Sequence, residues 1–561
     1  MRHPLALDNV LPHLEATFRD ALRSQLTDPE EPGVGAVVRS DDGRPSPWFT
    51  ASMIVAGAYL RLAGVDLDSS LLDRLLWAAD ALMALQRPSG LIDLPTVNID
   101  SAPDTGFTVQ QLCTVLELGG DMAAADGHWA ELLDKLGRFI RRAAAGMREG
   151  GFHTPNHRWV IASALTQAQA LFPDLDVEST IDAYLAEGID VDAEGFYIER
   201  SVGTYDAVNN RSWLLLADHR ELSSALDAVR RNLALDLHLL HADDTAETRL
   251  SRRQDYGRRE VPSNLIPCYL LYHRLRPTST FTEAARWLWT QAETPGNLLW
   301  TCYALLKGGD PAAAPDAALP TDFALHLPSN GIWRLRRGPL SVSAFRDATR
   351  LLSFGYGEAM LSGLRIDQTY FGGDCGHFVS DAMGVQGGQV VLRSEGCGRP
   401  RRPGYEQPLG RPVPPERWDE TMAKRELRRL PPATATLTLE EVAGGLSLHY
   451  WNVEGLEGIA VQVILDFEPG GIWETADTRL RPRPGQVLFL KEGWGEMRYG
   501  TDVIRVEGGA YAHSMWQMRE SAPPGDAVRV LLTFETPVDH TFRLIGTSTP
   551  DAVRCAGERE L

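Results

Sequence analysis

The spacing of apolar residues changes once along the chain, near residue 308. From about residue 10 to residue 306 apolar residues recur every three or four positions, which predicts ten to twelve helices joined by polar loops. An even series of helical hairpins with long loops predicts an α/α toroid whose cleft is lined by loops at one end. The clearest helical stretches are 53–62, 71–85, 109–118, 132–145, 159–171, 181–185, 222–235, 265–275 and 284–289.

Beyond this point the apolar period becomes two. Residues 308–315 read Gly-Gly-Asp-Pro-Ala-Ala-Ala-Pro, the composition of a linker. The later segments 433–439, 460–465, 486–490 and 528–534 alternate as strands do between Gly and Pro turns, which predicts stacked antiparallel sheets. We therefore expect an α+β multidomain chain. Its parts are a toroid catalytic domain at 1–310, a linker at 311–325 and an antiparallel β-sandwich at 326–561 that contributes to the cleft. A Pro- and Arg-rich loop at 399–417 could fold over that cleft.

Composition narrows the classes of partner. A length of 561 residues exceeds one hydrophobic core, and a net charge of −20 disfavours nucleic acid. An acidic saccharide is still compatible, because a pocket can be locally positive on an acidic protein. The chain contains no signal-peptide pattern and no run of 18 apolar residues, so we expect no membrane partner. The expected location is cytoplasmic, or secreted or periplasmic if a leader was removed. The six cysteines form no CxxC pair, which favours free thiols.

The stretch 150–159, Gly-Gly-Phe-His-Thr-Pro-Asn-His-Arg-Trp, places Asn156 and His157 at a predicted helix start. Free N–H groups and a partial positive charge at such a start suit an anionic ligand. The alternative is that Asn156 is an N-cap and His157 a surface residue of the first turn.

Four further polar loops could contribute to a site. They are 98–107, followed by a helix, then 199–210 with Tyr205, 251–259 with four arginines, and 367–378, where glycines flank His377. Guanidinium groups suit carboxylates, and glycines let a backbone approach a ligand closely. Helix capping, a solvated charge run or a tight turn would explain the same residues. The candidate substrate-binding residues are Asp104, Gln110, Arg200, Asn209, Asn210, Arg252, Arg253, Tyr256, Gln368 and Tyr370.

A helical toroid with an Asn-His pair at a helix start, a Tyr about fifty residues later and a sandwich that opens on Gly-Gly-x-x-Gly-His-Phe resembles a known family. It is similar to the heparinase II/III-like polysaccharide lyases, a group that includes alginate and oligo-alginate lyases. The resemblance implies cleavage at a uronic acid by β-elimination. It also implies that Asn156 and His157 sit against the uronate carboxylate, that Tyr205 transfers a proton, and that His377 shares this work.

The sequence departs from this family in one turn. The family often has His-Gly-His followed by Ala-Asp or Phe-Asp, whereas residues 374–379 read Asp-Cys-Gly-His-Phe-Val. This departure weakens the transfer of the structural zinc found in some members. We therefore predict no cofactor, with a structural zinc or calcium left open and His449 and His513 as candidate ligands.

The chemistry of elimination agrees with these residues. Removing a proton beside a carboxylate would place a second negative charge on the group, so a site must first neutralise the carboxylate. The amide of Asn156, a protonated or hydrogen-bonding His157 and a helix N-terminus are donors of the required kind. If Tyr205 removes the proton at C5 and then protonates the leaving glycosidic oxygen, elimination is syn; if His377 removes the proton and Tyr205 donates one, elimination can be anti.

Two other functions fit parts of the sequence. A glycoside hydrolase on a toroid would need two facing carboxylates, for which Asp100 or Asp104 could pair with Asp192 or Glu199. A non-catalytic carbohydrate-binding protein would use exposed tryptophans as sugar platforms. Its candidates are Trp451, Trp473, Trp494 and Trp516.

Overall fold

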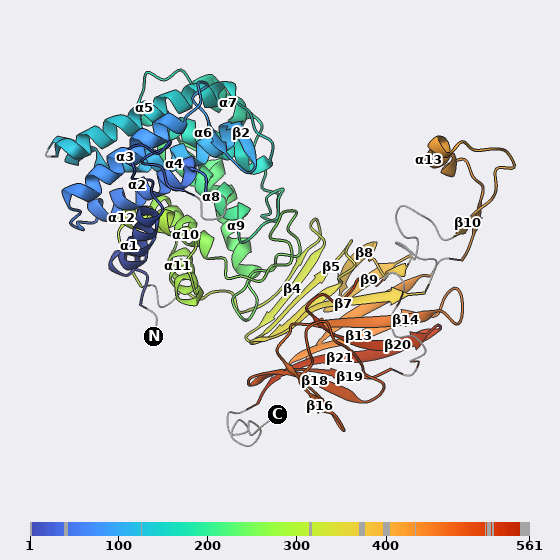
Figure 1. Ribbon diagram of the computed structural model, residues 1–561. Helices are drawn as coiled ribbons and strands as arrows, with labels where there is room; N and C mark the ends of the chain where they lie inside the picture. Colours follow the sequence, from blue (N-terminus) through green and yellow to red (C-terminus); the bar gives the residue numbers. More distant parts are fainter. Residues whose placement is uncertain are drawn as a thin grey trace. The chain divides into compact units, whose positions relative to one another are not determined.

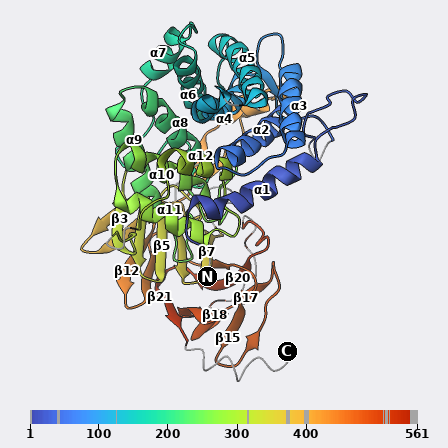
Figure 2. The same cartoon turned by 90° about the vertical axis from the view of Figure 1, so that its left-hand side faces the viewer.

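The computed structural model describes residues 3–38, 43–124, 126–313, 317–369, 376–395, 404–431, 433–510, 512, 518 and 521–549. The chain divides into two compact units (Figures 1 and 2). The first unit comprises Met1–Leu240 and Asp244–Leu319, and the second comprises His241–Asp243 and Pro320–Leu561.

The described part of the first unit contains twelve α-helices and one short hairpin. The helices are α1 (Leu7–Arg23), α2 (Pro47–Leu62), α3 (Ser69–Leu85), α4 (Ala102–Gly119), α5 (Gly127–Glu149), α6 (Pro155–Leu171), α7 (Glu178–Ala186), α8 (Tyr205–His219), α9 (Ser223–His238), α10 (Ile266–Leu275), α11 (Ser279–Gln291) and α12 (Leu298–Gly308). The hairpin pairs β1 (Ile92–Leu94) with β2 (Asn98–Ser101). Every helical stretch expected from the apolar spacing falls within, or largely overlaps, one of these helices.

The even-numbered helices form the inner ring of a toroid. Each packs on the next in the order α2, α4, α6, α8, α10 and α12, and α12 packs on α2 to close the ring. These helices are buried on nearly all sides, whereas outer helices such as α1 and α5 bury a single stripe of residues. A helix buried on all sides needs no amphipathic pattern, while an outer helix does.

Cross-contacts show that the inner helices run parallel. The hydroxyl groups of Tyr59 and Thr114, each about three turns into α2 and α4, lie 2.5 Å apart. The Gln110 amide in α4 donates to the hydroxyls of Ser163 in α6 and Ser212 in α8, at 2.5 and 3.1 Å. These residues lie at similar depths from their helix starts. The N-termini of the inner helices therefore gather at one end of the ring.

The opposite end of the ring carries an ion-pair cluster. Lys307 near the end of α12 bonds to Glu117 of α4 and Asp218 of α8. At the first end, the Cys268 thiol near the start of α10 meets the Ala207 carbonyl near the start of α8, at 3.4 Å. A lysine among helix C-termini also complements the negative ends of the helix dipoles. The two ends of the ring thus differ in charge.

The second unit is a sandwich of two large sheets. The eight-stranded sheet has the order β17-β20-β14-β7-β6-β5-β4-β3, and the nine-stranded sheet has the order β16-β15-β18-β19-β21-β13-β12-β9-β8. Every pairing in these sheets is antiparallel except the parallel pair β17–β20. The apolar core comes from alternate residues of both sheets, including Leu364, Val463, Leu437 and Leu448.

The strands of the eight-stranded sheet are β3 (Asp322–Leu327), β4 (Ile332–Arg337), β5 (Leu340–Phe345), β6 (Leu352–Tyr356), β7 (Ala359–Gln368), β14 (Ala460–Phe467), β17 (Val487–Phe489) and β20 (Val528–Glu535). Those of the nine-stranded sheet are β8 (Ala382–Gln386), β9 (Gln389–Ser394), β12 (Ala435–Val442), β13 (Gly445–Asn452), β15 (Ile472–Thr475), β16 (Arg479–Leu480), β18 (Trp494–Tyr499), β19 (Asp502–Glu507) and β21 (Val538–Ser548). The four strands expected from sequence correspond to β12, β14, β17 and β20. Strand β3 begins at Asp322, inside the stretch expected to be a linker.

The expected loop at 399–417 contains regular structure in its described part. Strands β10 (Gly404–Glu406) and β11 (Leu427–Arg429) pair as a separate two-stranded sheet. The short helix α13 (Trp418–Met422) lies between them in sequence. Within the described ranges, no helix is both long enough and apolar enough to cross a membrane.

Candidate functional site

Asn156 lies in the first turn of α6 but does not cap it. The helix begins at Pro155 with Thr154 as the N-cap residue, and the Asn156 side chain is fully buried. Its amide nitrogen donates to both carboxylate oxygens of Glu199, at 2.9 and 3.0 Å, and to the Thr154 hydroxyl at 3.2 Å. The interpretation of Asn156 as an N-cap is therefore wrong, because its side chain turns inward to a buried acid.

His157 is a buried, neutral imidazole. Its ring meets the rings of His153 and Phe107 edge-on, with centroids 4.5 and 6.1 Å apart. Burial, reinforced by the nearby His153 and Arg253, lowers the pKa of His157 from 6.5 to about 3. Among the described residues the Nδ1 atom has no hydrogen-bond partner. The protonated form considered from the sequence is thus disfavoured, and a neutral ring remains whose Nδ1 is available for a hydrogen bond.

Arg253 connects Glu199 to Tyr205. Its guanidinium group pairs with Glu199, and the centre of that group lies 3.9 Å from the centroid of the Tyr205 ring. The Tyr205 hydroxyl donates to the Gln254 side chain at 3.0 Å. Glu199 is 2% exposed, and burial raises its pKa against the opposing effects of Asn156 and Arg253. A positive charge therefore lies against a half-buried tyrosine and a buried acid.

Hydrogen bonds between two loops hold this arrangement. The backbone N–H of Tyr205, the first residue of α8, donates to the Ser201 hydroxyl at 3.1 Å. Ser201 in turn donates to Asp255 at 2.8 Å, and the Arg252 N–H donates to the Glu199 carbonyl at 3.0 Å. The loop before α8 is thus fastened to the arginine-rich loop, which brings Arg253 over Tyr205.

The structure brings Asn156, His157 and Tyr205 together around the Glu199–Arg253 pair. Glu199 was considered from sequence only as a hydrolase carboxylate, and Gln254 and His153 were not considered as site residues. A signal for Glu199 existed, since an arginine at a buried position calls for a buried acid.

Three expected substrate-binding residues lie in the helical interior instead. Gln110, Asn209 and Asn210 are fully buried. Gln110 bonds to serines of two neighbouring helices, and the Asn210 carbonyl oxygen accepts from the Tyr197 hydroxyl at 3.0 Å. The expectation that these three residues bind substrate is therefore replaced by a packing role. The inner helices bury even their polar side chains, so these residues have no exposed surface for a saccharide to contact.

The other expected binding residues of the first unit remain accessible. Arg252 and Tyr256 are exposed, and Arg200 is half-buried in the left-handed backbone region, with φ of 52°. Asp104 accepts hydrogen bonds from the side chains of Ser101, the N-cap residue of α4, and Asn98, so it supports the start of that helix. The exposed arginines place positive charge beside the site.

His377 belongs to the second unit. Its Nδ1 lies 2.8 Å from the carboxylate of Asp367, which is 1% exposed and also accepts from the Ser521 hydroxyl. A buried carboxylate on Nδ1 fixes the orientation and tautomer of an imidazole. Gln368 is buried at the end of β7, and Tyr370 lies outside the described residues. Asp367 is thus a further functional candidate that the sequence did not indicate.

The carboxylates expected of a hydrolase have local structural partners. The Asp104 carboxylate accepts from the Ser101 and Asn98 side chains, the Asp192 carboxylate accepts from the backbone N–H of Glu194 and Phe196, and Glu199 pairs with Arg253. The Asp100 carboxylate bonds to the Ser89 hydroxyl. Because these carboxylates are held by hydrogen bonds or an ion pair within the protein, a pair of facing carboxylates of the kind that hydrolysis requires is disfavoured.

The proposed aromatic platforms of the second unit are also corrected in part. Trp473 is 2% exposed and belongs to the sandwich core, while Trp494 is covered by the guanidinium group of Arg505 at 4.2 Å. Trp451 is half-buried, and Trp516 lies outside the described residues. Burial removes Trp473 as a sugar platform.

Neither candidate metal position in the described chain has a ligand set free for an ion. His449 is exposed and bonds to Asp539 at 2.7 Å, and His513 lies outside the described residues. Glu117, Asp218 and His219 lie close enough together to hold an ion, but Lys307 already bonds to both acids. An ammonium group therefore neutralises that cluster.

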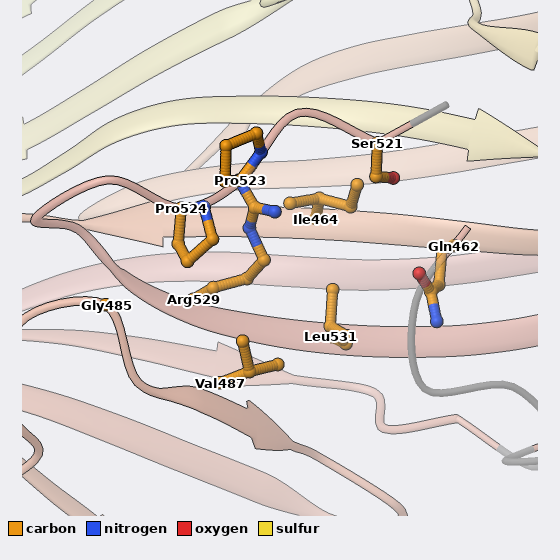
Figure 3. A pocket seen from close by; sticks show the side chains of 9 residues that line it. All are labelled: Gln462, Ile464, Gly485, Val487, Ser521, Pro523, Pro524, Arg529 and Leu531. Carbon is orange, nitrogen blue, oxygen red and sulfur yellow. The ribbon is translucent and has the colours of Figure 1, made fainter. Parts of the chain in front are cut away.

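A cavity of about 180 Å³ lies in the second unit, where Arg529 points toward Ser521 and two prolines (Figure 3). Arg529 bonds to both carboxylate oxygens of Asp466, at 2.7 and 3.1 Å, and to the Ala522 carbonyl at 2.7 Å. Because these bonds occupy the guanidinium group, the arrangement serves the folding of the sandwich. The candidate functional site is therefore the cluster in the first unit.

Comparisons with known proteins bear on the whole chain. No protein-family model and no curated protein matches the sequence. Solved structures do match: a Paenibacillus xanthan lyase has a TM-score of 0.59 at 10% identity, over 98% of this chain and 58% of that one. A heparan sulfate lyase mutant from Pedobacter heparinus has a TM-score of 0.54 at 9% identity, over 97% and 89%. A chondroitin AC lyase mutant of Streptomyces coelicolor has a TM-score of 0.52 at 11% identity, over 98% and 81%. The resemblance to the heparinase II/III-like lyases is thus confirmed at the level of fold: the chain has the toroid and β-sandwich architecture of polysaccharide lyases.

Proposed function

We propose that the protein is a lyase that cleaves a glycosidic bond to a uronic acid by β-elimination and leaves a 4,5-unsaturated uronate end. One observation carries the proposal. Asn156, His157 and Tyr205 lie at the starts of the neighbouring parallel helices α6 and α8, around the Arg253–Glu199 pair. An acidic polysaccharide or oligosaccharide is the substrate.

The substrate carboxylate binds where positive charge gathers. Each helix N-terminus carries about half an elementary charge, and the starts of α6 and α8 lie side by side. Arg253 adds a full charge, and the exposed Arg252 attracts the anion from solution. This local field allows an acidic substrate to bind a protein whose net charge is −20.

In this binding step Glu199 acts as a protonated acid that donates a hydrogen bond. The Asn156 amide donates to Glu199 and Thr154, so Asn156 acts on the substrate through Glu199 rather than directly. Burial already raises the pKa of Glu199, and a uronate carboxylate beside it would favour the protonated acid further. A neutral Glu199 then donates a hydrogen bond to the uronate and reduces its charge.

Tyr205 transfers the proton of the reaction. Loss of the C5 proton leaves an electron pair that forms the C4–C5 double bond as the bond from C4 to the glycosidic oxygen breaks. The leaving oxygen takes a proton from Tyr205, and if Tyr205 also removed the C5 proton the elimination is syn. A part for His377, whose ring Asp367 orients, stays a prediction from the sequence. The neutral His157 has one ring N–H, which donates a hydrogen bond to the developing enolate.

The test is a panel of uronic-acid polymers and oligomers, followed by the ultraviolet absorbance of an unsaturated uronate. We expect absorbance to rise with at least one of them. The Tyr205→Phe variant should lose turnover and keep substrate affinity within about threefold, because only the transferred proton is missing. Tyr184→Phe, a tyrosine on α7, is the matched control and should retain turnover. Turnover retained by Tyr205→Phe would exclude Tyr205 as the proton-transfer group.

A further inference from the structure

Two neighbouring aromatic rings are exposed at the start of α2. Trp48 is 48% exposed and Phe49 is 44% exposed, and their rings stack with centroids 6.1 Å apart and an interplanar angle of 14°. Pro47 opens the helix, and the Ser46 hydroxyl accepts from the Phe49 N–H. A capped helix start therefore holds a flat aromatic surface rigidly in solvent, the kind of surface on which sugar rings stack.

A groove of about 430 Å³ adjoins this aromatic pair, between α1 and α2. Its apolar wall includes Phe49 and Met53, and its polar side chains are those of Thr17, Asp20, Ser24 and Ser52. Hydroxyl and carboxylate groups bond to sugar hydroxyls, while the apolar wall fits the C–H face of a pyranose ring. None of the described residues that line the groove is Lys or Arg, and Asp20 would repel a uronate. The lining therefore matches a neutral sugar.

The groove lies at the same end of the toroid as the candidate site. It is lined by the first turns of α2, and the inner helices start together at this end. In the ring α4 separates α2 from α6. In a closed ring of six helices, neighbour spacings of about 8–10 Å put the starts of α2 and α6 roughly 14–17 Å apart. That distance exceeds the length of a disaccharide, so only a longer saccharide reaches both the groove and the candidate site.

We propose that the groove beside Trp48 and Phe49 is a subsite for a neutral pyranose residue of the saccharide chain, separate from the position of cleavage. This subsite rests on the proposed function, which identifies the ligand as a saccharide that contains uronates. It narrows the substrate class to oligosaccharides or polysaccharides of several residues that contain neutral sugars as well as uronates. A peptide segment or a second copy of this chain would be the occupant if the sugar chemistry does not hold.

Calorimetric titration with two neutral probes, cellohexaose and maltohexaose, tests the subsite without any turnover. We expect the wild-type protein to bind at least one probe, and Trp48→Ala to weaken that binding about tenfold, the loss of a single stacking contact of about 1.4 kcal/mol. Trp77→Ala is the matched control, because Trp77 is similarly exposed, at 44%, but lies on α3 and does not belong to the Trp48–Phe49 pair that adjoins the groove. It should bind like the wild type, and thermal unfolding should confirm that both variants are folded.

The outcomes separate the two proposals. Absence of binding to both probes, or equal weakening in the Trp48 and Trp77 variants, overturns the subsite. A wild-type dimer in light scattering that dissociates in Trp48→Ala overturns it too and assigns the surface to a second copy. Neutral-probe binding without any unsaturated product would contradict the elimination alone. Unsaturated product with no neutral-probe binding would contradict the subsite alone.

Discussion

Replacing His157 by glutamine tests the neutral, buried state of this imidazole. Burial lowers the pKa of His157 to about 3, with His153 and Arg253 contributing, whereas an unfolded chain has a histidine pKa near 6.5. Below pH 6.5 the unfolded chain therefore binds more protons at this residue than the folded protein. The stability that depends on neutral His157 is complete above about pH 6.5 and is lost as the pH falls towards 3.

The size of this effect follows from about 1.36 kcal/mol per pKa unit. Lowering the pH from about 6.5 to about 5 should cost about 2 kcal/mol through His157 alone. The His157→Gln variant lacks the titrating group, so it should lose about 2 kcal/mol less than the wild type over this interval. Its stability at pH 7 can be lower for other reasons, but the dependence on pH is the informative quantity.

Urea unfolding at pH 7, 6 and 5, followed by the helical circular dichroism signal, measures this dependence for the toroid. The matched control is His128→Gln, because the His128 side chain is 53% exposed on α5. The control should follow the wild-type pH dependence. Parallel curves for the wild type and His157→Gln would refute the argument that His157 is held neutral by burial.

Three further predictions concern charge at or near the site. Arg253→Met should lower kcat/KM about a hundredfold or more, while Arg252→Met should change it much less, and equal effects would contradict the contact between Arg253 and Tyr205. Raising the salt concentration should raise KM for an acidic substrate because the exposed arginines are screened, so a salt-independent KM would count against anion attraction. Burial raises the pKa of Asp206 to about 7 and also raises that of Asp236. The stability that depends on these two acids should therefore decline as the pH rises from about 4 to about 7, so Asp236→Asn should gain stability relative to the wild type over this interval; an unchanged difference between the two proteins would contradict the raised pKa values.

The toroid and the sandwich could be predicted because their signals are local. Apolar spacing marks α2 to α7 and α9 to α11, and alternation marks strands such as β14 and β20. Short-range patterns also indicated helix starts near Asn156 and Tyr205. Cleft loops follow from where helices begin, so much of the site region was predictable without a structure.

The partners within the site were not predictable in the same way. Asn156 and Glu199 are 43 positions apart, and no periodicity encodes which buried acid meets which amide or arginine. Gln110 was misplaced because a polar residue near a helix start resembles a surface position, whereas the inner ring buries it against Ser163 and Ser212. The charge state of His157 also depends on burial, which sequence alone does not give.

The mass balance of cleavage tests elimination most directly. A defined uronic-acid tetrasaccharide that the protein cleaves is digested with it, and the masses of all products are measured by mass spectrometry. Elimination adds no water, so the product masses should sum to that of the substrate, and the new non-reducing end should absorb in the ultraviolet. Products whose masses sum to the substrate plus one water would contradict the account and identify a hydrolase.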